Sequence, residues 1–188
     1  VAGIDYSDPG KIRLEVWYPA GDVSTAPRKG WIDNDPLVFQ GFEIMTGYPE
    51  ELFEHIYRVK TNSFIDAPPV DDSSTWPIII LLLGWSSISE LHTSLAESLA
   101  SAGYLVVGIE HPGACAVVSF SNGDVHYFLG NDLLERLPEG TRESKVRMLS
   151  EYLARDINYA IEYLNGMNED PSSDFFERLN MNEIGLYG

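Results

Sequence analysis

The last five residues of the chain have the pattern of a hydrolase turn. Residues 184–188, IGLYG, read as a short buried strand that runs into a glycine. This is the first half of the G-x-S-x-G nucleophile elbow, in which a strained turn carries a reactive serine. In that pattern the serine stands two positions after Gly188. We therefore expect the chain to be the front part of a hydrolase, truncated before its elbow serine.

A second turn offers a serine inside the chain. Residues 84–88, GWSSI, follow an apolar run and precede a helical pattern. Ser86 is therefore an alternative nucleophile, with Asp124 and His126 completing the chain order Ser, Asp, His. Two features argue against this alternative. Ile88 stands where the tight turn favours a small residue, and the two partners flank a predicted hairpin.

The histidines do not form a metal-binding pattern. His55, His92 and His126 are scattered without ligand spacing, and no cysteine or carboxylate cluster accompanies them, so we expect no metal site. His111 follows a predicted strand and is a candidate general base, because histidine titrates near neutrality. We favour instead a structural histidine, hydrogen-bonded at the strand end beside a satisfied Glu110.

The composition limits the partners. A chain of 188 residues suits one domain that buries roughly two-thirds of its unfolded surface. The 29 acidic and 12 basic residues give a net charge of −17, which repels phosphate backbones, so we expect no nucleic-acid partner. Cys115 is the one cysteine, which excludes an internal disulfide. No N-terminal signal is recognisable, and the longest apolar run, residues 77–84, is too short to span a bilayer.

Strand and helix patterns alternate after an irregular front end. Residues 11–18 alternate apolar and polar positions, which predicts a strand with one buried face and Trp17 on the other face. Residues 78–83 are apolar throughout and suit a central strand covered on both faces. The other predicted elements are a helix opened by Pro49, a helix from Ser89 to Gly103, a strand over 104–109, a hairpin at 120–125, a helix from Thr141 to Gly166, a short helix over 173–179 and a strand over 183–187.

These elements predict an α/β fold with a mostly parallel sheet. Helices between buried strands act as crossovers, and the reactive groups of such sheets gather outside the carboxyl ends of the strands. Three ends qualify: after Leu83, after Ile109 and after Tyr187. We expect the last strand to be central in a complete fold. Without the strands that follow, its open edge invites a complementing chain or self-association.

Six segments carry a family resemblance. They are residues 13–19 (RLEVWYP), 58–68 (RVKTNSFIDAP), 84–86 (GWS), 102–104 (AGY), 110–114 (EHPGA) and 184–188 (IGLYG). In this order they resemble the platelet-activating-factor acetylhydrolase family of α/β-hydrolases. The W-Y-P and E-H-P pieces are fairly specific, whereas G-L-Y-G is generic to the fold. The resemblance implies an α/β-hydrolase fold, with residues 1–188 as one partial domain and residues 31–60 as an irregular helical insertion near the active-site entrance.

The resemblance also implies a serine esterase without a cofactor, which cleaves short or oxidised acyl chains from phospholipid-like or other small esters. The family's serine, acid and histidine lie beyond the position that matches Gly188, so no triad residue maps onto this chain. One catalytic part does: the backbone N–H of Trp85 as an oxyanion donor, with Gly84 and Ser86 beside the substrate. Leu83 stands where the family usually has His or Pro, and Ser86 where a glycine is common.

Alternatives to this function stay open. One is a non-catalytic binding piece completed by another chain, and another is a dienelactone-hydrolase-like or polyester-cleaving enzyme. The resemblance favours a secreted or periplasmic location. The aromatic residues of the front segment fit either a rim in transient contact with lipid surfaces or a core that covers the sheet, and we favour the core. They are Trp31, Phe39, Phe42, Tyr48, Phe53 and Tyr57.

Overall fold

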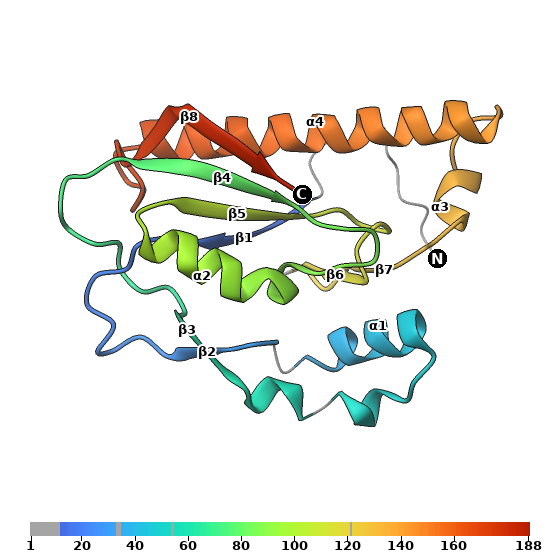
Figure 1. The fold of residues 1–188 in the computed structure, drawn as a ribbon, viewed down its shortest axis with the longest axis horizontal. Helices are drawn as coiled ribbons and strands as arrows, with labels where there is room; N and C mark the ends of the chain where they lie inside the picture. Colours follow the sequence, from blue (N-terminus) through green and yellow to red (C-terminus); the bar gives the residue numbers. More distant parts are fainter. Residues whose placement is uncertain (1–11, 33–34, 54, 121) are drawn as a thin grey trace.

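A four-stranded sheet forms the centre of the fold (Figure 1). The computed structural model describes residues 12–32, 35–53, 55–120 and 122–188. The strands lie in the order β1-β5-β4-β8, where β1 is Arg13–Trp17, β5 is Leu105–Glu110, β4 is Trp76–Leu82 and β8 is Leu179–Tyr187. β4 is parallel to both of its neighbours, and β1 is antiparallel to β5. The mostly parallel α/β sheet predicted from the sequence is confirmed.

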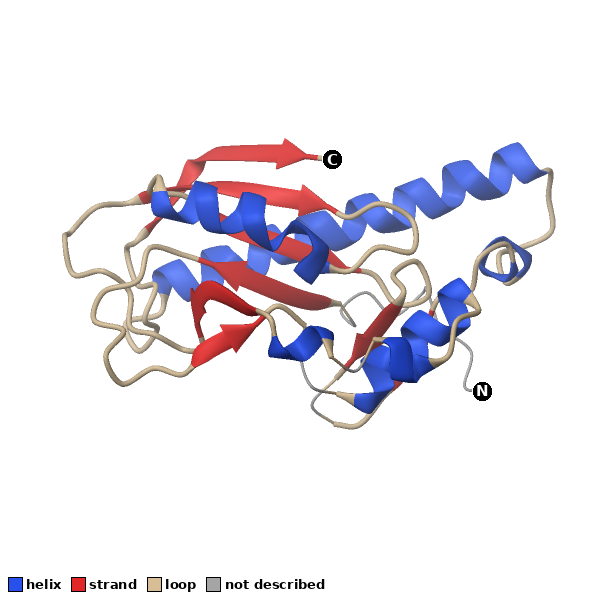
Figure 2. Cartoon of the chain, turned by 60° about the horizontal axis from the view of Figure 1, so that its bottom comes forward, coloured by secondary structure: helices blue, strands red, loops and turns tan. Residues whose placement is uncertain are grey.

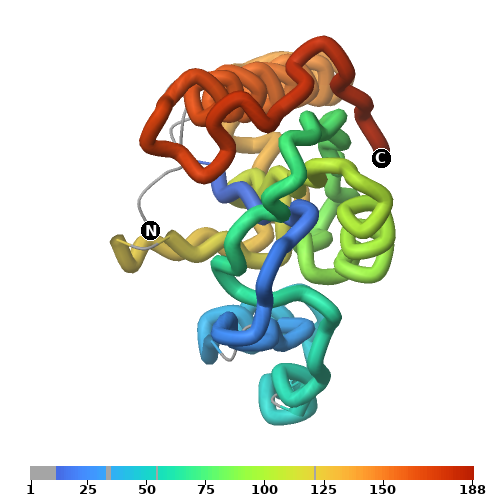
Figure 3. Tube along the Cα trace, turned by 90° about the vertical axis from the view of Figure 1, so that its left-hand side faces the viewer, coloured from blue at the N-terminus to red at the C-terminus, as the bar shows by residue number. Residues whose placement is uncertain are grey.

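The apolar run of β4 is explained by helices on both faces of the sheet. Ile78 and Ile80 pack in one cluster with α4 (Arg142–Glu169), whereas Leu81 packs in another with α2 (Thr93–Ser101). Successive strand side chains point to opposite faces, so both sets are buried. Figure 3 shows α4 and α2 on opposite sides of the sheet.

Trp17 corrects the prediction for the first strand. The alternating pattern placed it on the polar face, but its side chain is only 5% exposed. It packs with Leu81, Ala96 and Val106 beneath α2. β1 is therefore covered on both faces, because a helix also lies over the side that carries Arg13 and Glu15.

The two long helical patterns differ from prediction at their ends. Thr141 caps α4 as predicted, since its Oγ1 accepts the Ser144 N–H at 3.2 Å. α4 does not end at Gly166 but continues to Glu169. The helix predicted from Ser89 is divided into the 3-10 helix η3 (Ser89–His92) and α2. Gly103, with φ of 96°, follows α2 as predicted, because glycine adopts left-handed backbone at little cost.

The front segment folds differently from its pattern. The helix expected from Pro49 is only the 3-10 turn η1 (Glu50–Leu52), which η2 (Ile56–Arg58) follows. The α-helix of this region is α1 (Pro36–Thr46), capped by the carboxylate of Asp35, which accepts the Leu37 N–H. The aromatic residues follow the core interpretation in part: Phe39 and Phe42 are buried, while Tyr48 is 62% exposed.

Smaller elements complete the structure. β2 (Arg28–Gly30) and β3 (Lys60–Phe64) form an antiparallel pair, as do β6 (Val117–Ser119) and β7 (Val125–Tyr127). The second pair confirms the predicted hairpin, and Figure 2 shows it next to α1. A short helix α3 (Asp132–Glu135) precedes α4. Residues 173–179 form turns and the start of β8, so the predicted short helix there is wrong.

β8 is an edge strand of this sheet, with one edge open as expected for this chain. Its partner is β4, with Tyr187 opposite Leu81, and the side chains of Leu186 and Tyr187 near its end are 58% and 56% exposed. The end of β8 lies beside the end of β4. A Cβ placed on Gly188 would stand only 2.8 Å from the Cβ of Leu82. In the described part of the chain, no helix has the length and apolar character needed to cross a membrane.

Candidate active site

The predicted strand ends meet at one edge of the sheet. Leu82 of β4 lies opposite Ile109 of β5, and Leu81 lies opposite Tyr187 of β8. The turn at Gly84, the Glu110–His111 corner and the end of β8 are therefore neighbours. This is the edge at which parallel α/β sheets gather their reactive groups.

The turn after β4 is tied to the loop after β5 by backbone hydrogen bonds. The Ser86 N–H donates to the carbonyl of Ala114 at 2.8 Å, and the Ala116 N–H donates to the carbonyl of Ser87 at 3.1 Å. Within the turn, the Ser87 N–H donates to the carbonyl of Gly84 at 2.9 Å. We call residues 84–89 the oxyanion loop, after the oxyanion role that the family resemblance implies for Trp85.

Trp85 presents an unpaired donor at the surface of this loop. None of the hydrogen bonds among the described residues uses its backbone N–H, and the indole is 49% exposed, with its ring edge-on to Phe128 at 5.5 Å. Gly84 has open space where a side chain would stand. An anionic oxygen can therefore approach this amide without displacing a protein partner.

Ser86 has an unusual backbone. Its φ is 61°, in the left-handed region that only glycine adopts without steric cost. This conformation explains why a glycine suits the position better than the serine that stands here. It also resembles the strained turn of a nucleophile elbow. Whether Ser86 can act as the nucleophile therefore depends on where Asp124 and His126 lie.

The partners of the alternative nucleophile are not assembled. Asp124 is hydrogen-bonded to Asn122 next to the hairpin turn. His126 stands on β7 with its ring against Phe120, and no hydrogen bond between described residues joins it to Ser86. The alternative triad of Ser86, Asp124 and His126 is therefore not formed in this structure.

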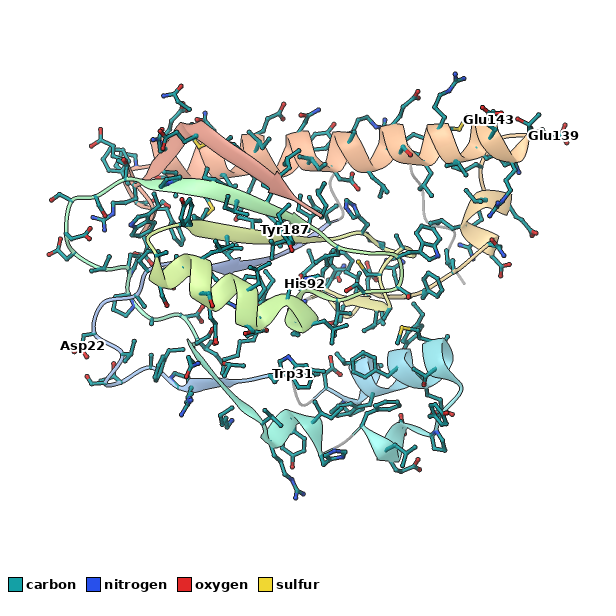
Figure 4. The ribbon with its side chains drawn as sticks, in the orientation of Figure 1. Asp22, Trp31, His92, Glu139, Glu143 and Tyr187 are labelled. Carbon is teal, nitrogen blue, oxygen red and sulfur yellow. The ribbon has the colours of Figure 1, made fainter. Side chains whose placement is uncertain are left out.

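A serine and a histidine do approach each other in the same loop. Ser87 Oγ lies 3.4 Å from Nε2 of His92, which stands at the start of α2 (labelled in Figure 4). The distance is long for a hydrogen bond. No acid orients the imidazole by a hydrogen bond within the described chain, so the pair lacks the third member of a triad.

A buried ionic cluster lies beneath the oxyanion loop. Arg13 contacts Glu110 at 2.7 Å, Glu15 at 3.0 Å and Glu90 at 3.6 Å. Lys29 contacts the second oxygen of Glu15. Burial, followed by the charge of Glu110, raises the pKa of Glu90 to about 7. No sequence pattern indicated this cluster, because Arg13 is far along the chain from Glu90 and Glu110 and belongs to an apparently polar strand face.

His111 is held at the end of β5, as the structural interpretation predicted. Its Nδ1 lies 2.8 Å from Oδ2 of Asp156 on α4, and its backbone N–H donates to Cys115 Sγ at 3.3 Å. Glu110 is likewise satisfied, by Arg13 and by the Ser89 N–H at 3.0 Å. Among the described residues no group of three or more His, Cys, Asp or Glu side chains is arranged to hold a metal.

The comparisons with known proteins define the class of this fold. Over 93% of its length the chain superimposes on a ferulic acid esterase from Streptomyces cinnamoneus, with a TM-score of 0.67 and 22% identity. At this identity the match shows the fold alone, an α/β fold with a mostly parallel central sheet. The match covers 43% of that esterase.

The sequence places the chain in a family. Residues 4–148 match the model for platelet-activating factor acetylhydrolase, isoform II, and the chain belongs to this family of α/β-hydrolases. A probable 1-alkyl-2-acetylglycerophosphocholine esterase from Arthroderma benhamiae is 33% identical over 54 residues, which are 29% of this chain and 14% of that protein. The matched residues thus span less than half the length of each of these two proteins.

Proposed function

We propose that this chain supplies the sheet and the oxyanion loop of a serine-type carboxylic ester hydrolase that acts on short or oxidised acyl esters, phospholipid-like esters among them. The observation that supports this most directly is the Trp85 amide, which is unpaired among the described residues, whereas the amides of Ser86, Ser87 and Ser89 in the same loop are held. Family membership supports the reaction class, and the meeting of three strand ends supports the location.

The proposed mechanism assigns this chain one step. An elbow serine after β8 attacks the ester carbonyl, a histidine takes the serine proton, and the carbonyl oxygen becomes an anion. The Trp85 N–H donates a hydrogen bond to that anion, beside a second donor from the amide after the serine. Such a donor contributes on the order of 3 to 4 kcal/mol of transition-state stabilisation. Gly84 and Ser86 flank the substrate, and residues 31–60 wall the entrance.

The first test uses the chain of 188 residues with p-nitrophenyl acetate. We expect hydrolysis at the background rate, unchanged in Ser86→Ala, because no complete triad is formed among the described residues. Robust turnover that Ser86→Ala abolishes would overturn the proposal in favour of Ser86 as the nucleophile.

The second test uses a form of the protein that carries the elbow serine. Trp85→Pro removes the donor, and we expect it to lower kcat by 10²-fold to 10³-fold. Trp85→Ala is the matched control, since it keeps the amide and removes only the indole, and its kcat should stay within tenfold. Equal losses in the two variants would assign the effect to the side chain and contradict an oxyanion role for the amide.

One observation favours a second candidate, a piece completed by another chain. β8 lies at the sheet edge with exposed Leu186 and Tyr187, and such an edge pairs readily with a further strand. Size-exclusion chromatography with an apolar dye tests this candidate. A monomer that does not bind the dye argues against it.

A further inference from the structure

The oxyanion loop ends on a buried carboxylate. Glu110 is the last residue of β5 and its side chain is 1% exposed. Its Oε1 accepts the backbone N–H of Ser89 at 3.0 Å, and its Oε2 accepts from Arg13 Nη1 at 2.7 Å. Ser89 closes the loop that begins at Gly84, so this hydrogen bond fixes the end of the loop opposite to β4.

β5 is shaped to receive that end of the loop. Gly108 and Glu110 are two residues apart and therefore lie on the same face of the strand. A Cβ at Gly108 would stand 2.6 Å from Ser89 Oγ and 3.2 Å from Ser89 Cβ. The glycine thus gives room for Ser89, and the glutamate two positions later binds its amide.

The charge of Glu110 is balanced by Arg13, a residue on another strand. Arg13 of β1 contacts Glu110 directly and also reaches Glu90 of η3 and Glu15 of its own strand. A hydrogen bond to an ionised acceptor is roughly twice as strong as one between neutral groups. Removal of one member of a buried pair leaves an uncompensated charge, so this anchor is rigid when complete and fails when one member is lost.

The loop is held at three places that leave Trp85 free. The Ser86 amide is bound by Ala114, the Ser87 carbonyl by Ala116, and the Ser89 amide by Glu110. A preorganised donor needs such support, because a loose one must be reordered during the reaction. Ala114 and Ala116, which make the two backbone contacts, lie in another loop, whereas Glu110 lies at the end of a central strand.

We propose that Glu110 is a positioning residue for the ester hydrolase reaction. By accepting the Ser89 N–H, Glu110 holds the Trp85 amide in its donor orientation. Gly108 leaves the space that this contact needs. The inference rests on the proposed function for its catalytic consequence. Its structural part, the anchoring of residues 84–89, is measurable in the chain itself.

The experiment compares Glu110→Gln with Glu97→Gln by amide hydrogen exchange. Glu97 is a matched control, because its carboxylate also accepts a backbone N–H, that of Asn62 at 2.6 Å, at a site on α2 and β3. We expect exchange over residues 85–89 to rise at least tenfold in Glu110→Gln and to stay unchanged in Glu97→Gln. Unchanged exchange in Glu110→Gln, or a rise of equal size throughout the chain, would overturn the anchoring role.

A second variant covers the case in which Glu110→Gln does not fold. Gly108→Ala leaves the carboxylate intact and displaces Ser89 by its Cβ, so the same residues should exchange faster. In the unaltered chain, the Ser89 amide should exchange much more slowly than the unpaired Trp85 amide. Equal exchange of these two amides contradicts the proposal without any variant.

Catalysis separates this inference from the proposed function. In a form that carries the elbow serine, Glu110→Gln should lower kcat at least tenfold and leave KM within twofold, because the oxyanion forms only during the reaction. If the loop opens but kcat is unchanged, Glu110 is not a positioning residue although the esterase proposal stands. If Trp85→Pro also leaves kcat unchanged, it is the oxyanion assignment that fails.

Discussion

The imidazole of His111 lies 2.8 Å from the carboxylate of Asp156, and this contact joins the end of β5 to the middle of α4. The residues are 45 positions apart in the chain, so their contact reports tertiary packing. The orientation of His111 toward the helix, and the bond from its amide to Cys115, fit a structural role for this histidine.

The first prediction concerns this contact. Asp156→Ala should lower the free energy of unfolding by about 1 to 3 kcal/mol, because a partly buried polar partner is left unsatisfied. Glu151→Ala is the matched control, since it removes an exposed carboxylate from the same helix, and we expect less than about 0.5 kcal/mol. Urea denaturation measures both. Equal effects in the two variants would show that the His111 contact does not stabilise the fold.

The second prediction concerns pH. Burial and the charge of Glu110 raise the pKa of Glu90 from 4.5 to about 7, while Arg13 opposes this shift and Glu15 adds to it. Between these values the folded protein holds a proton that the unfolded chain has released, so stability falls as the pH rises through this window. The loss is on the order of 3 kcal/mol.

The variant Glu90→Gln isolates this effect. It cannot release the proton, so its stability relative to the unaltered chain should increase from pH 5 to pH 8. Urea denaturation of both proteins at the two pH values gives the comparison. A difference that does not change with pH would show that Glu90 titrates normally.

The third prediction concerns Cys115. Its thiol is buried, and burial, followed by the charge of Glu110, raises its pKa to about 12. The thiolate is the reactive form, so native protein at pH 8 should not react with Ellman's reagent within minutes, and one thiol should react at once in denaturant. Since the sequence has one cysteine, the reaction reports this site alone. Rapid reaction of the native protein would contradict the burial.

The sequence predicted the elements whose signals are local. β4 is apolar throughout and β5 is apolar up to Ile109. Thr141 is a capping residue, and Gly123, with φ of 90°, marks the hairpin. Each of these elements was therefore predicted from its own residues. The contacts between distant residues were not predicted. Arg13 and Glu110 are 97 positions apart, and their opposite charges are common to many pairs in the chain.

The errors have a physical pattern as well. Trp17 was placed on a polar face because alternation describes one strand and not the helix that covers it. Pro49 and its acidic neighbours begin only a 3-10 turn with no buried residue, and most helical stability in proteins comes from packing of an apolar face. The role expected for the Trp85 amide was inferred from the family resemblance, because no side-chain pattern in the sequence indicates an unpaired backbone donor.

The last prediction concerns the backbone of Ser86. Its φ of 61° costs a residue with a side chain about 1 kcal/mol, while glycine has more freedom to lose on folding. We expect Ser86→Gly to increase the free energy of unfolding by less than about 1 kcal/mol. We expect Ser86→Val to lower it by about 2 kcal/mol, because a β-branched residue resists this conformation. The hydroxyl is lost in both variants, so the comparison separates backbone strain from chemistry. Equal stability of the two variants, measured by thermal unfolding, would show that the left-handed turn is not formed in solution.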